Sequence, residues 1–290
     1  MQPGEEVDTA VHESGLPVTA HDGSKFELLS RCRADAHDLI YWMPALGVAA
    51  KHYLPLADAL AEQGVAMVIH EWRGIGSSDQ RAGRRVDWRY KELLTLDMPA
   101  GLAATGRQWP SARLWLGGHS LGGQLAAIYG GLHTERFSGL LLAASGAPYW
   151  RQYPHGWAIG LSYIAAPWLA RLAGYFPGRR LGFGGNEARG VIDDWARTGR
   201  TGRYSARGMD HDLDARMACA RWPVLALRMR DDWMVPQASL DWLLGKMPAA
   251  AHTQVVLGDE ELGTRADHFS WMRRPRSVAA HMLRWIGERS

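Results

Sequence analysis

The stretch that decides the expected fold is LWLGGHSLGGQ, residues 114–124. An apolar run leads to a serine between two glycines, Gly118-x-Ser120-x-Gly122, and helical spacing begins at Leu121. A serine on a sharp turn from strand to helix has a strained backbone and close neighbours, so glycines are needed two residues before and after it. The helix that follows directs its amides and the positive end of its dipole at the serine. We therefore interpret Ser120 as a nucleophile, the alternative being a purely structural turn.

Candidate partners for this serine follow two later apolar runs. A serine hydroxyl is a weak nucleophile unless a base accepts its proton and a carboxylate orients that base. In a parallel sheet these groups are expected in loops after later strands, the carboxylate first and the histidine last. Asp231 and Asp232 follow the expected strand 223–229, and His268 follows the expected strand 253–257. This order predicts His268 as the base and one of the two aspartates as the acid.

The rest of the sequence alternates between apolar runs and segments with helical spacing. The expected strands are 18–21, 25–33, 38–43, 65–69, 113–117, 137–144, 223–229 and 253–257, and the expected helices are 51–63, 88–104, 121–133, 237–246 and 277–288. This alternation predicts an α/β fold, with a mostly parallel central sheet flanked by helices on both faces. The first fifteen residues are expected to form a loose tail.

The alternation stops in the middle of the chain. We expect a core made of residues 1–147 and 222–290, interrupted by one inserted lid at 148–221. The lid has weak helical patches at 157–172 and 191–195 and is rich in aromatic residues. It is therefore expected to form an apolar roof over the serine.

Three aromatic residues of this lid, Trp150, Trp157 and Tyr163, are candidate contacts for an apolar substrate. A helix over 157–172 would place Ile159, Tyr163 and Ala166 near one face. The alternative is that the aromatic side chains only pack the lid on the core.

Composition excludes several classes of protein. With 290 residues, 47% hydrophobic and 22% charged, the chain is neither disordered nor fibrous in character. The net charge of +3 comes mostly from scattered arginines, which predicts no nucleic-acid partner. The longest uncharged stretch, 152–170, is interrupted by Pro154, His155 and Pro167, so we expect no stable membrane insertion.

The cysteines and the N-terminus bear on the cellular compartment. Cys32 and Cys219 are far apart and match no zinc or redox spacing, as expected for reduced thiols. Residues 1–6 are acidic and polar, where a signal peptide would be basic and then apolar. A cytoplasmic location is the expectation.

On these motifs the chain resembles the α/β-hydrolase superfamily. The segment GHSLGG looks like its nucleophile elbow, His268 looks like its catalytic histidine, and Asp232-x-x-Val235-Pro236 looks like its acid-bearing turn. The resemblance thus favours Asp232 over Asp231. EWRGIGSS, residues 71–78, is similar to the Asp-x-Arg-Gly-x-Gly-x-Ser turn of the superfamily, with Glu71 in place of aspartate.

The chain also departs from the superfamily pattern at two places. Pro44-Ala45 stands where the family has His-Gly, and Asp267, expected to be a solvated loop residue, stands where it has glycine before the histidine. By position, the resemblance implies that the amides of Leu46 and Leu121 form the oxyanion hole. The lid segments resemble a bacterial subgroup of predicted hydrolases and serine-aminopeptidase-like proteins.

We expect a serine hydrolase that needs neither metal nor cofactor and that cleaves a small hydrophobic acyl substrate, as a carboxylesterase or lysophospholipase does. An aminopeptidase would need an acidic anchor for a free amine, for which Glu187, Asp193 and Asp194 are candidates. Acyl transfer uses the same triad, whereas dehalogenase and epoxide hydrolase chemistry needs aspartate at position 120. A non-catalytic binding protein is the alternative from another class.

Weaker patterns receive structural interpretations. The segment 210–214 contains three aspartates and a histidine, and is expected to be solvated or to begin a helix rather than to bind metal. Four arginines that recur without intervening acidic residues could meet an anionic group, but are expected to be solvated: Arg197, Arg200, Arg203 and Arg207. The other histidines considered are expected to lie away from the reacting groups: His70, His119, His252 and His281.

Overall fold

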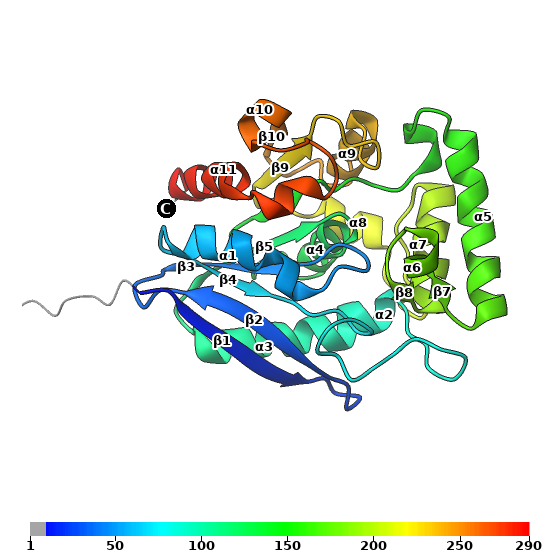
Figure 1. The fold of residues 1–290 in the computed structure, drawn as a ribbon, viewed down its shortest axis with the longest axis horizontal. Helices are drawn as coiled ribbons and strands as arrows, with labels where there is room; N and C mark the ends of the chain where they lie inside the picture. The colour runs from blue at the N-terminus through cyan, green and yellow to red at the C-terminus, as the bar shows by residue number, and fades with distance from the viewer. Residues whose placement is uncertain (1–9, 290) are drawn as a thin grey trace, which may run out of the picture.

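A sheet of eight strands runs through the centre of the molecule (Figure 1). The computed structural model describes residues 10–289. The strands, in chain order, are β1 (His12–Thr19), β2 (Lys25–Cys32), β3 (Asp38–Met43), β4 (Val65–Ile69), β5 (Arg113–His119), β6 (Leu140–Ala143), β9 (Val224–Met229) and β10 (His252–Leu257). Their order in the sheet is β1-β2-β4-β3-β5-β6-β9-β10, and only β2 runs antiparallel to its neighbours. The predicted α/β class with a mostly parallel sheet is confirmed.

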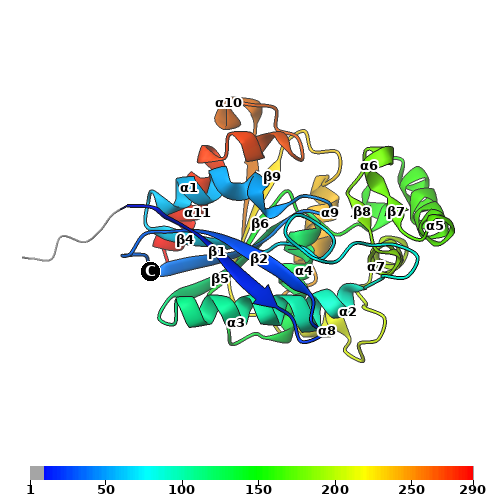
Figure 2. The ribbon, with the colours of Figure 1, turned by 60° about the horizontal axis from the view of Figure 1, so that its bottom comes forward.

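Helices cover both faces of this sheet, as Figure 2 shows for α1 and α11 on one side and α3 on the other. The first face carries α1 (Leu54–Ala61) and α11 (Arg276–Gly287), and the second carries α3 (Met98–Gln108), α4 (Leu121–Leu132), α8 (Leu213–Ala218) and α9 (Gln237–Leu244). The central strand β3 alternates between the two cores, with Tyr41 on the second face and Trp42 on the first. Period-two alternation of apolar residues buried on both faces is expected of a strand in the middle of such a sheet.

The edge strand β1 corrects the expected tail. It begins at His12 and pairs with β2 over eight residues, so the strand starts well before the predicted 18–21. Most of its residues are at least partly exposed, and Gly15 and Pro17 weaken the strand pattern, which is tolerated at an edge. Residues 1–9 of the expected tail lie outside the described residues.

The helix expected over 88–104 is interrupted. A short helix α2 (Tyr90–Glu92) passes through a π-helical turn (Leu93–Asp97) into α3. Pro99 lacks the N–H that would bond to the carbonyl four residues earlier, which accounts for a break at this point. Within the turn, the buried Asp97 receives hydrogen bonds from Arg73, at 2.9 Å from Nε.

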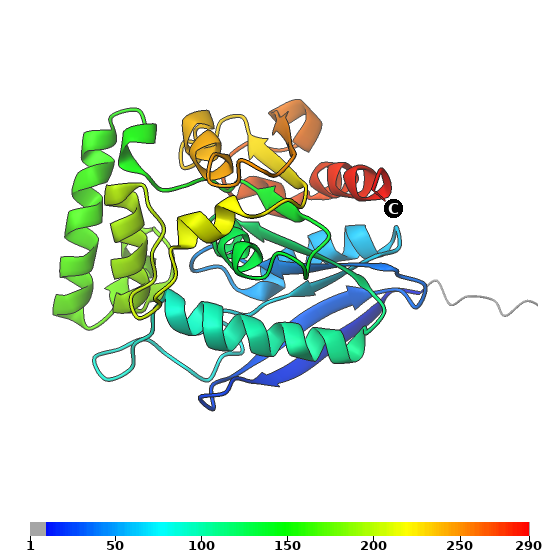
Figure 3. The same cartoon turned by 180° about the vertical axis from the view of Figure 1, so that it is seen from behind.

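Residues 148–221, here called the insertion segment, leave the sheet after β6 and return at β9, although these two strands are neighbours. The segment carries α5 (Gly156–Ala173), the hairpin of β7 (Phe176–Pro177) and β8 (Asn186–Glu187), α6 (Gly178–Leu181), α7 (Arg189–Thr201) and α8. Figures 1 and 3 both show α5 at the outer edge of the molecule, with α7 between it and the core.

Helix α5 runs through Pro167, so the helical patch expected at 157–172 is present. Proline cannot donate to the carbonyl four residues earlier, that of Tyr163. Nη1 of Arg200 in α7 lies 2.6 Å from this carbonyl oxygen and donates to it instead. A side chain of α7 therefore supplies the donor that Pro167 lacks. No helix within residues 10–289 combines the length and apolarity required to cross a bilayer.

Candidate active site

Ser120 occupies a strained turn between β5 and α4. Its backbone angles are φ 54° and ψ −122°, a region that residues with a Cβ rarely adopt. A Cβ at Gly118 would lie 2.5 Å from the backbone of Gly122 and Gly123, and one at Gly122 would lie 2.1 Å from the carbonyl oxygen of Met43. The sequence pattern Gly-x-Ser-x-Gly is thus required by backbone contacts on both sides of the serine.

Asp232 and His268 come together at the C-terminal ends of β9 and β10. His268 Nδ1 lies 2.7 Å from Asp232 Oδ2, and both side chains are buried. The other carboxylate oxygen accepts hydrogen bonds from the amides of Met234 and Val235, at 2.9 and 3.2 Å. Asp231 instead has a side chain that is 58% exposed and lies 3.5 Å from Arg230. Of the two candidate acids, Asp232 is the one that contacts the histidine.

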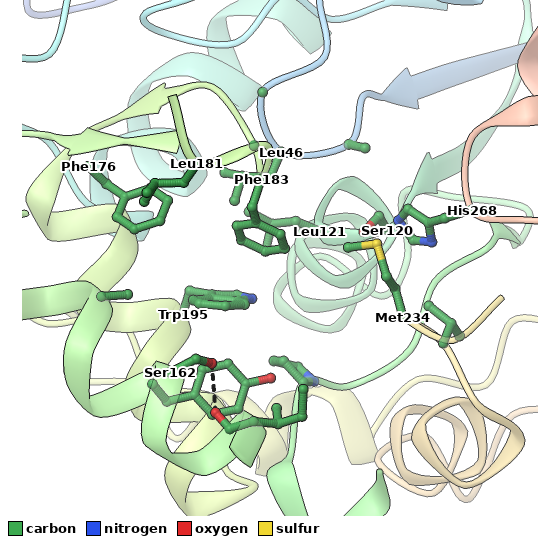
Figure 4. A pocket seen from close by; sticks show the side chains of 18 of the residues that line it. Leu46, Ser120, Leu121, Ser162, Phe176, Leu181, Phe183, Trp195, Met234 and His268 are labelled. Carbon is green, nitrogen blue, oxygen red and sulfur yellow. Dashed lines mark hydrogen bonds between the residues drawn. The ribbon is translucent and has the colours of Figure 1, made fainter. Parts of the chain in front are cut away.

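The remaining ring nitrogen of His268 has no partner in the described part of the chain. His268 and Ser120 line the same cavity, and Figure 4 shows their side chains beside each other. His268 Nε2 is buried and has no hydrogen-bond partner within residues 10–289. Because Nδ1 is bonded to Asp232, Nε2 is the atom available to accept a proton from the serine. His268, bonded to Asp232, thus lies beside Ser120 at the cavity.

Two backbone amides beside the serine are available to an oxyanion. Leu121 is the first residue of α4, so its N–H has no acceptor within the helix, and Leu46 follows β3. Both residues line the cavity, and neither amide donates a hydrogen bond to another group of residues 10–289. The positions carried over from the superfamily pattern therefore fit a two-amide oxyanion hole.

The loop that carries Leu46 is held from both sides, although it lacks the family's His-Gly. The Ala45 amide donates to the Tyr53 hydroxyl at 2.9 Å, and Trp72 Nε1 donates to the Pro44 carbonyl at 2.8 Å. A Cβ at Gly47, whose φ is +77°, would lie 2.0 Å from the amide nitrogen of Gly185 in the insertion segment. These contacts fix the loop without the usual glycine.

Glu71 also stabilises this loop. Its buried carboxylate accepts the Ala50 amide at 2.9 Å and the Ser77 amide at 3.4 Å. Burial raises the pKa of Glu71, and the two amide bonds oppose that rise. A Cβ at Gly76 would lie 1.8 Å from a carboxylate oxygen of Glu71. The glycine thus makes room for glutamate where the superfamily pattern has aspartate.

His119 is buried directly behind the catalytic constellation. Its ring centroid lies 4.7 Å from that of His268, and its Nδ1 lies 2.9 Å from the Tyr53 hydroxyl. Burial, and next the neighbouring His268, lower the pKa of His119 well below its usual range, so it is neutral near pH 7. Sequence reasoning placed His119 away from the reacting groups and missed both this contact and the part played by Tyr53, since the two residues are far apart in the sequence.

The other histidines lie in structural positions. His70 is fully buried with Nδ1 2.8 Å from the Tyr41 hydroxyl, and burial lowers its pKa to about 3. His252 begins β10, and His281 in α11 lies 2.6 Å from Glu261. Asp267 accepts the amides of Phe269 and Ser270 and so begins the turn after His268.

The cavity in front of Ser120 has a volume of about 670 Å³, within the range of small-molecule sites. It lies between the core loops and the insertion segment (Figure 4). Its apolar walls include Leu46, Ile159, Ala166, Leu169, Phe176, Phe183, Trp195, Met234 and Val235. No Asp, Glu, Lys or Arg of the described chain is among its lining residues.

Only one of the three aromatic residues predicted to contact substrate lines the cavity. Tyr163 is on the wall, together with Ile159 and Ala166 of the same helical face. Trp157 is 66% exposed on the outside of α5, and Trp150 precedes that helix with Arg151 stacked 5.2 Å from its ring. The cavity wall residues Phe183, Met234 and Trp233 were not predicted, because they lie on loops without a periodic pattern.

The carboxylates considered as amine anchors do not line the cavity. Glu187 is buried and accepts the Gly185 amide at 2.7 Å, and burial raises its pKa to about 7. Asp193 pairs with Arg171 at 2.8 Å, and Asp194 is fully buried and pairs with Arg197 at 3.1 Å. Asp194 also accepts the Tyr90 amide of the core at 3.3 Å, so all three carboxylates are engaged by other groups.

Of the other charged residues, some are paired within the described chain, while Arg203 and Arg207 are exposed. Arg200 donates to the Tyr163 carbonyl, as described above, and Arg203 lies 3.3 Å from Asp212. Asp212 caps α8 by accepting the Ala215 amide at 3.1 Å, and Asp214 pairs with Lys246 at 2.6 Å. Within residues 10–289 no group of three or more His, Cys, Asp or Glu side chains is arranged to hold a metal ion.

With this geometry in hand, comparison with known proteins identifies the family. The family model described as serine aminopeptidase, S33, matches residues 34–259, most of the chain. The chain belongs to the S33 serine aminopeptidase family. As a member, it is a hydrolase of the α/β-hydrolase superfamily, and the resemblance expected from its motifs is confirmed. A search of curated protein sequences finds no significant match.

Solved structures agree on the fold of this S33 family member. The Pyrococcus furiosus esterase Pf2001 is 16% identical, with a TM-score of 0.57 over 97% of this chain and 91% of that chain. A thermophilic esterase from Thermogutta terrifontis is 15% identical, with a TM-score of 0.62 over 96% and 99%. A membrane phospholipase A described as a bacterial virulence factor is also 15% identical, with a TM-score of 0.62 over 97% and 87%. At these identities the likeness establishes the shared fold alone.

Proposed function

We propose that the chain is a serine hydrolase that cleaves hydrophobic carboxylic esters through an acyl-enzyme, as a carboxylesterase or lysophospholipase does. The observation that carries the proposal is the cavity itself. Its described lining combines Ser120 and His268 with apolar walls and contains no charged side chain of Asp, Glu, Lys or Arg. An uncharged acyl chain can enter such a site without desolvating an ion, whereas a charged substrate would find no partner there.

The proposed mechanism uses the groups described above. Ser120 Oγ attacks the acyl carbonyl while His268 Nε2 accepts its proton, and Asp232 stabilises the imidazolium through Nδ1. The amides of Leu46 and Leu121 donate to the oxyanion of the tetrahedral intermediate. His268 then protonates the leaving alcohol as the ester C–O bond breaks. Water, deprotonated by His268, attacks the acyl-enzyme and releases the carboxylic acid and Ser120.

An aminopeptidase activity, which the family description names, receives less support from this site. A free α-amine in an apolar cavity requires a carboxylate partner. Glu187, Asp193 and Asp194 are all engaged elsewhere, and Asp232 is occupied by His268 and two amides. Acyl transfer to an alcohol remains compatible with the same triad, because an alcohol can replace water in the second step.

Fluorophosphonate labelling tests the nucleophile without knowledge of the substrate. We expect labelling of the wild type at the peptide that contains Ser120 and no labelling of Ser120→Ala. Ser162→Ala is the matched control, since Ser162 also lines the cavity but only donates to the Ile159 carbonyl at 2.7 Å. Labelling that persists in Ser120→Ala, or a folded wild type that does not react, would contradict the proposal and, in the second case, favour a binding protein.

A substrate panel then separates the activities. We expect hydrolysis of p-nitrophenyl acyl esters to exceed that of aminoacyl p-nitroanilides. The reverse preference would identify an aminopeptidase. Added primary alcohols that divert the acyl group into new esters would identify an acyltransferase.

A further inference from the structure

Helix α5 has two apolar faces, and only one of them is buried. The inner face carries the buried residues Tyr163, Ala166 and Ala170. Tyr163 and Ala166, together with Ile159, line the cavity. The outer face carries five large apolar side chains at spacings of three and four residues, which places them along one stripe. They are Trp157, Leu161, Ile164, Trp168 and Leu172, with exposed fractions of 66, 57, 52, 62 and 72%. We call these five residues the outer stripe.

The outer stripe is continuous with the opening of the cavity. Leu169, one position after Trp168, is exposed and also lines the cavity. Leu181 of α6 is likewise exposed and lines the cavity. Trp233 and Phe269, on the core loops, are exposed and line the same cavity. Exposed apolar side chains therefore lie both along α5 and around the entrance to the site.

The charges beside the outer stripe are of one sign. Residues 148–186 contain four arginines, Arg151, Arg171, Arg179 and Arg180, and no aspartate or glutamate. All four side chains are exposed. Across from α5, Asp193 of α7 pairs with Arg171 at 2.8 Å, and the buried Glu187 accepts the Gly185 amide. The face that α5 presents is thus apolar in the middle and basic around it.

We propose that the outer stripe of α5 docks the protein on an anionic phospholipid surface, with the cavity entrance facing the lipid. Tryptophan and leucine along one helical face, flanked by arginines, are the composition of helices that lie in the interfacial plane of a bilayer. Such docking is peripheral, since the stripe enters the headgroup region and no helix of residues 10–289 is long and apolar enough to cross the bilayer. Arginines around the stripe supply attraction to anionic headgroups, which salt weakens.

The docking does not depend on the proposed hydrolysis, because none of the residues of the outer stripe lines the cavity. If the proposed hydrolysis is also correct, the acyl chains of a lipid substrate would enter between Leu169 and Trp233 without passing through water. The binding test can therefore be made with catalytically silent protein. Its failure would leave the labelling of Ser120 unaffected.

Vesicle flotation of the full-length Ser120→Ala protein tests the docking. We expect co-flotation with vesicles of phosphatidylglycerol and phosphatidylcholine in equal amounts, weaker binding to pure phosphatidylcholine, and a fall with added salt. Trp157→Ser with Trp168→Ser, and independently Leu161→Ser with Leu172→Ser, are each expected to lower binding by about tenfold or more. Val256→Ser, which removes an exposed apolar side chain from β10, is the control and leaves binding unchanged.

Charge reversal tests the arginines separately. Arg179→Glu with Arg180→Glu is expected to abolish the preference for phosphatidylglycerol, while Arg107→Glu on the exposed surface of α3 preserves it. Wild-type-like flotation of both stripe variants, or no flotation of the parent protein with anionic vesicles, overturns the proposal. So does a dimer in solution that the Trp157 and Trp168 substitutions dissociate, since a second copy would then cover the stripe.

Discussion

The hydroxyl of Tyr53 lies 2.9 Å from Nδ1 of His119, the residue immediately before Ser120. The same hydroxyl accepts the amide of Ala45, immediately before Leu46, at 2.9 Å. One buried side chain therefore joins the turn that carries the nucleophile to the loop that carries a proposed oxyanion donor. None of these atoms belongs to the proposed triad, but the two hydrogen bonds fix the segment that carries Ser120 relative to the loop that carries Leu46.

Tyr53→Phe is predicted to lower kcat more than it changes KM. The substitution leaves the Ala45 amide and His119 Nδ1 without their partner, at a cost of about 1 to 3 kcal/mol in the free energy of unfolding. It also frees the Leu46 loop, so the oxyanion is held less well in the transition state. Tyr90→Phe is the control, because the Tyr90 hydroxyl is buried without a hydrogen-bond partner within the described chain. Equal kcat values in the two variants would refute the positioning role.

Asp232→Asn is predicted to lower kcat by roughly 10³- to 10⁴-fold, since an amide cannot stabilise the imidazolium and favours the wrong tautomer. Asp231→Asn, a neighbouring change at an exposed carboxylate, is expected to retain nearly full activity. Steady-state kinetics on a p-nitrophenyl ester provides the measurement. A larger loss in Asp231→Asn would reverse the assignment of the acid.

Ser120→Gly is predicted to unfold at higher urea concentration than Ser120→Ala, although both are inactive. Glycine relieves the strain of φ 54° and ψ −122°, whereas alanine retains the Cβ that causes it. We expect a difference of about 1 to 2 kcal/mol in the free energy of unfolding. If the urea unfolding curves of the two variants have identical midpoints and slopes, the turn stores no strain.

Glu187→Gln is predicted to reduce the pH dependence of stability. Burial raises the pKa of Glu187 from 4.5 to about 7, so between these values the folded carboxyl keeps a proton that the unfolded one has lost. The folded state then binds more protons, and the free energy of unfolding contributed by this group falls as pH rises through the window. The difference in the free energy of unfolding between wild type and variant should change by about 3 kcal/mol from pH 4.5 to above 7. Urea titrations at several pH values measure it.

The control for that experiment is Glu260→Gln, at an exposed position of α10 (Asp259–Leu262). It should show the same pH profile as the wild type. If Glu187→Gln also does, the carboxyl of Glu187 is ionised in the folded protein throughout this range.

Ala166→Trp is predicted to shift substrate preference toward short acyl chains. Ala166 lies on the cavity wall formed by α5, so a large side chain there shortens the space in front of Ser120. We expect kcat/KM for long-chain p-nitrophenyl esters to fall by about tenfold or more, with acetate esters little affected. Ala158→Trp, on the same helix at an exposed position, should leave the preference unchanged. A uniform loss across chain lengths would place the acyl group elsewhere.

Sequence alone predicted the sheet, and that Ser120, Asp232 and His268 lie at its edge, because both depend on local patterns. Ser120, Asp232 and His268 each follow an apolar strand, and parallel strands bring their ends to one edge of the sheet. The face of α5 was harder to assign, since Trp157 and Tyr163 belong to opposite faces that are both apolar. Periodicity identifies a helix but cannot say which of two apolar faces meets the core.

Contacts between distant segments account for the other differences. The carbonyl left without a donor by Pro167 in α5 is bonded by Arg200 of α7. His119 is bonded by Tyr53, which lies 66 positions away in the sequence. The early start of β1 depends on pairing with β2 rather than on its own composition. Each of these is a tertiary contact that no local pattern encodes.

The close approach of Gly47 to Gly185 has a consequence for engineering. Segments inserted into this fold are attractive units for exchange between enzymes, because they begin and end at adjacent strands. Here a graft that replaced residues 148–221 would also remove the backbone of Gly185, which Gly47 contacts closely. A chimera with altered specificity would have to import residues 44–50 from the same donor, so the unit of exchange is two segments rather than one.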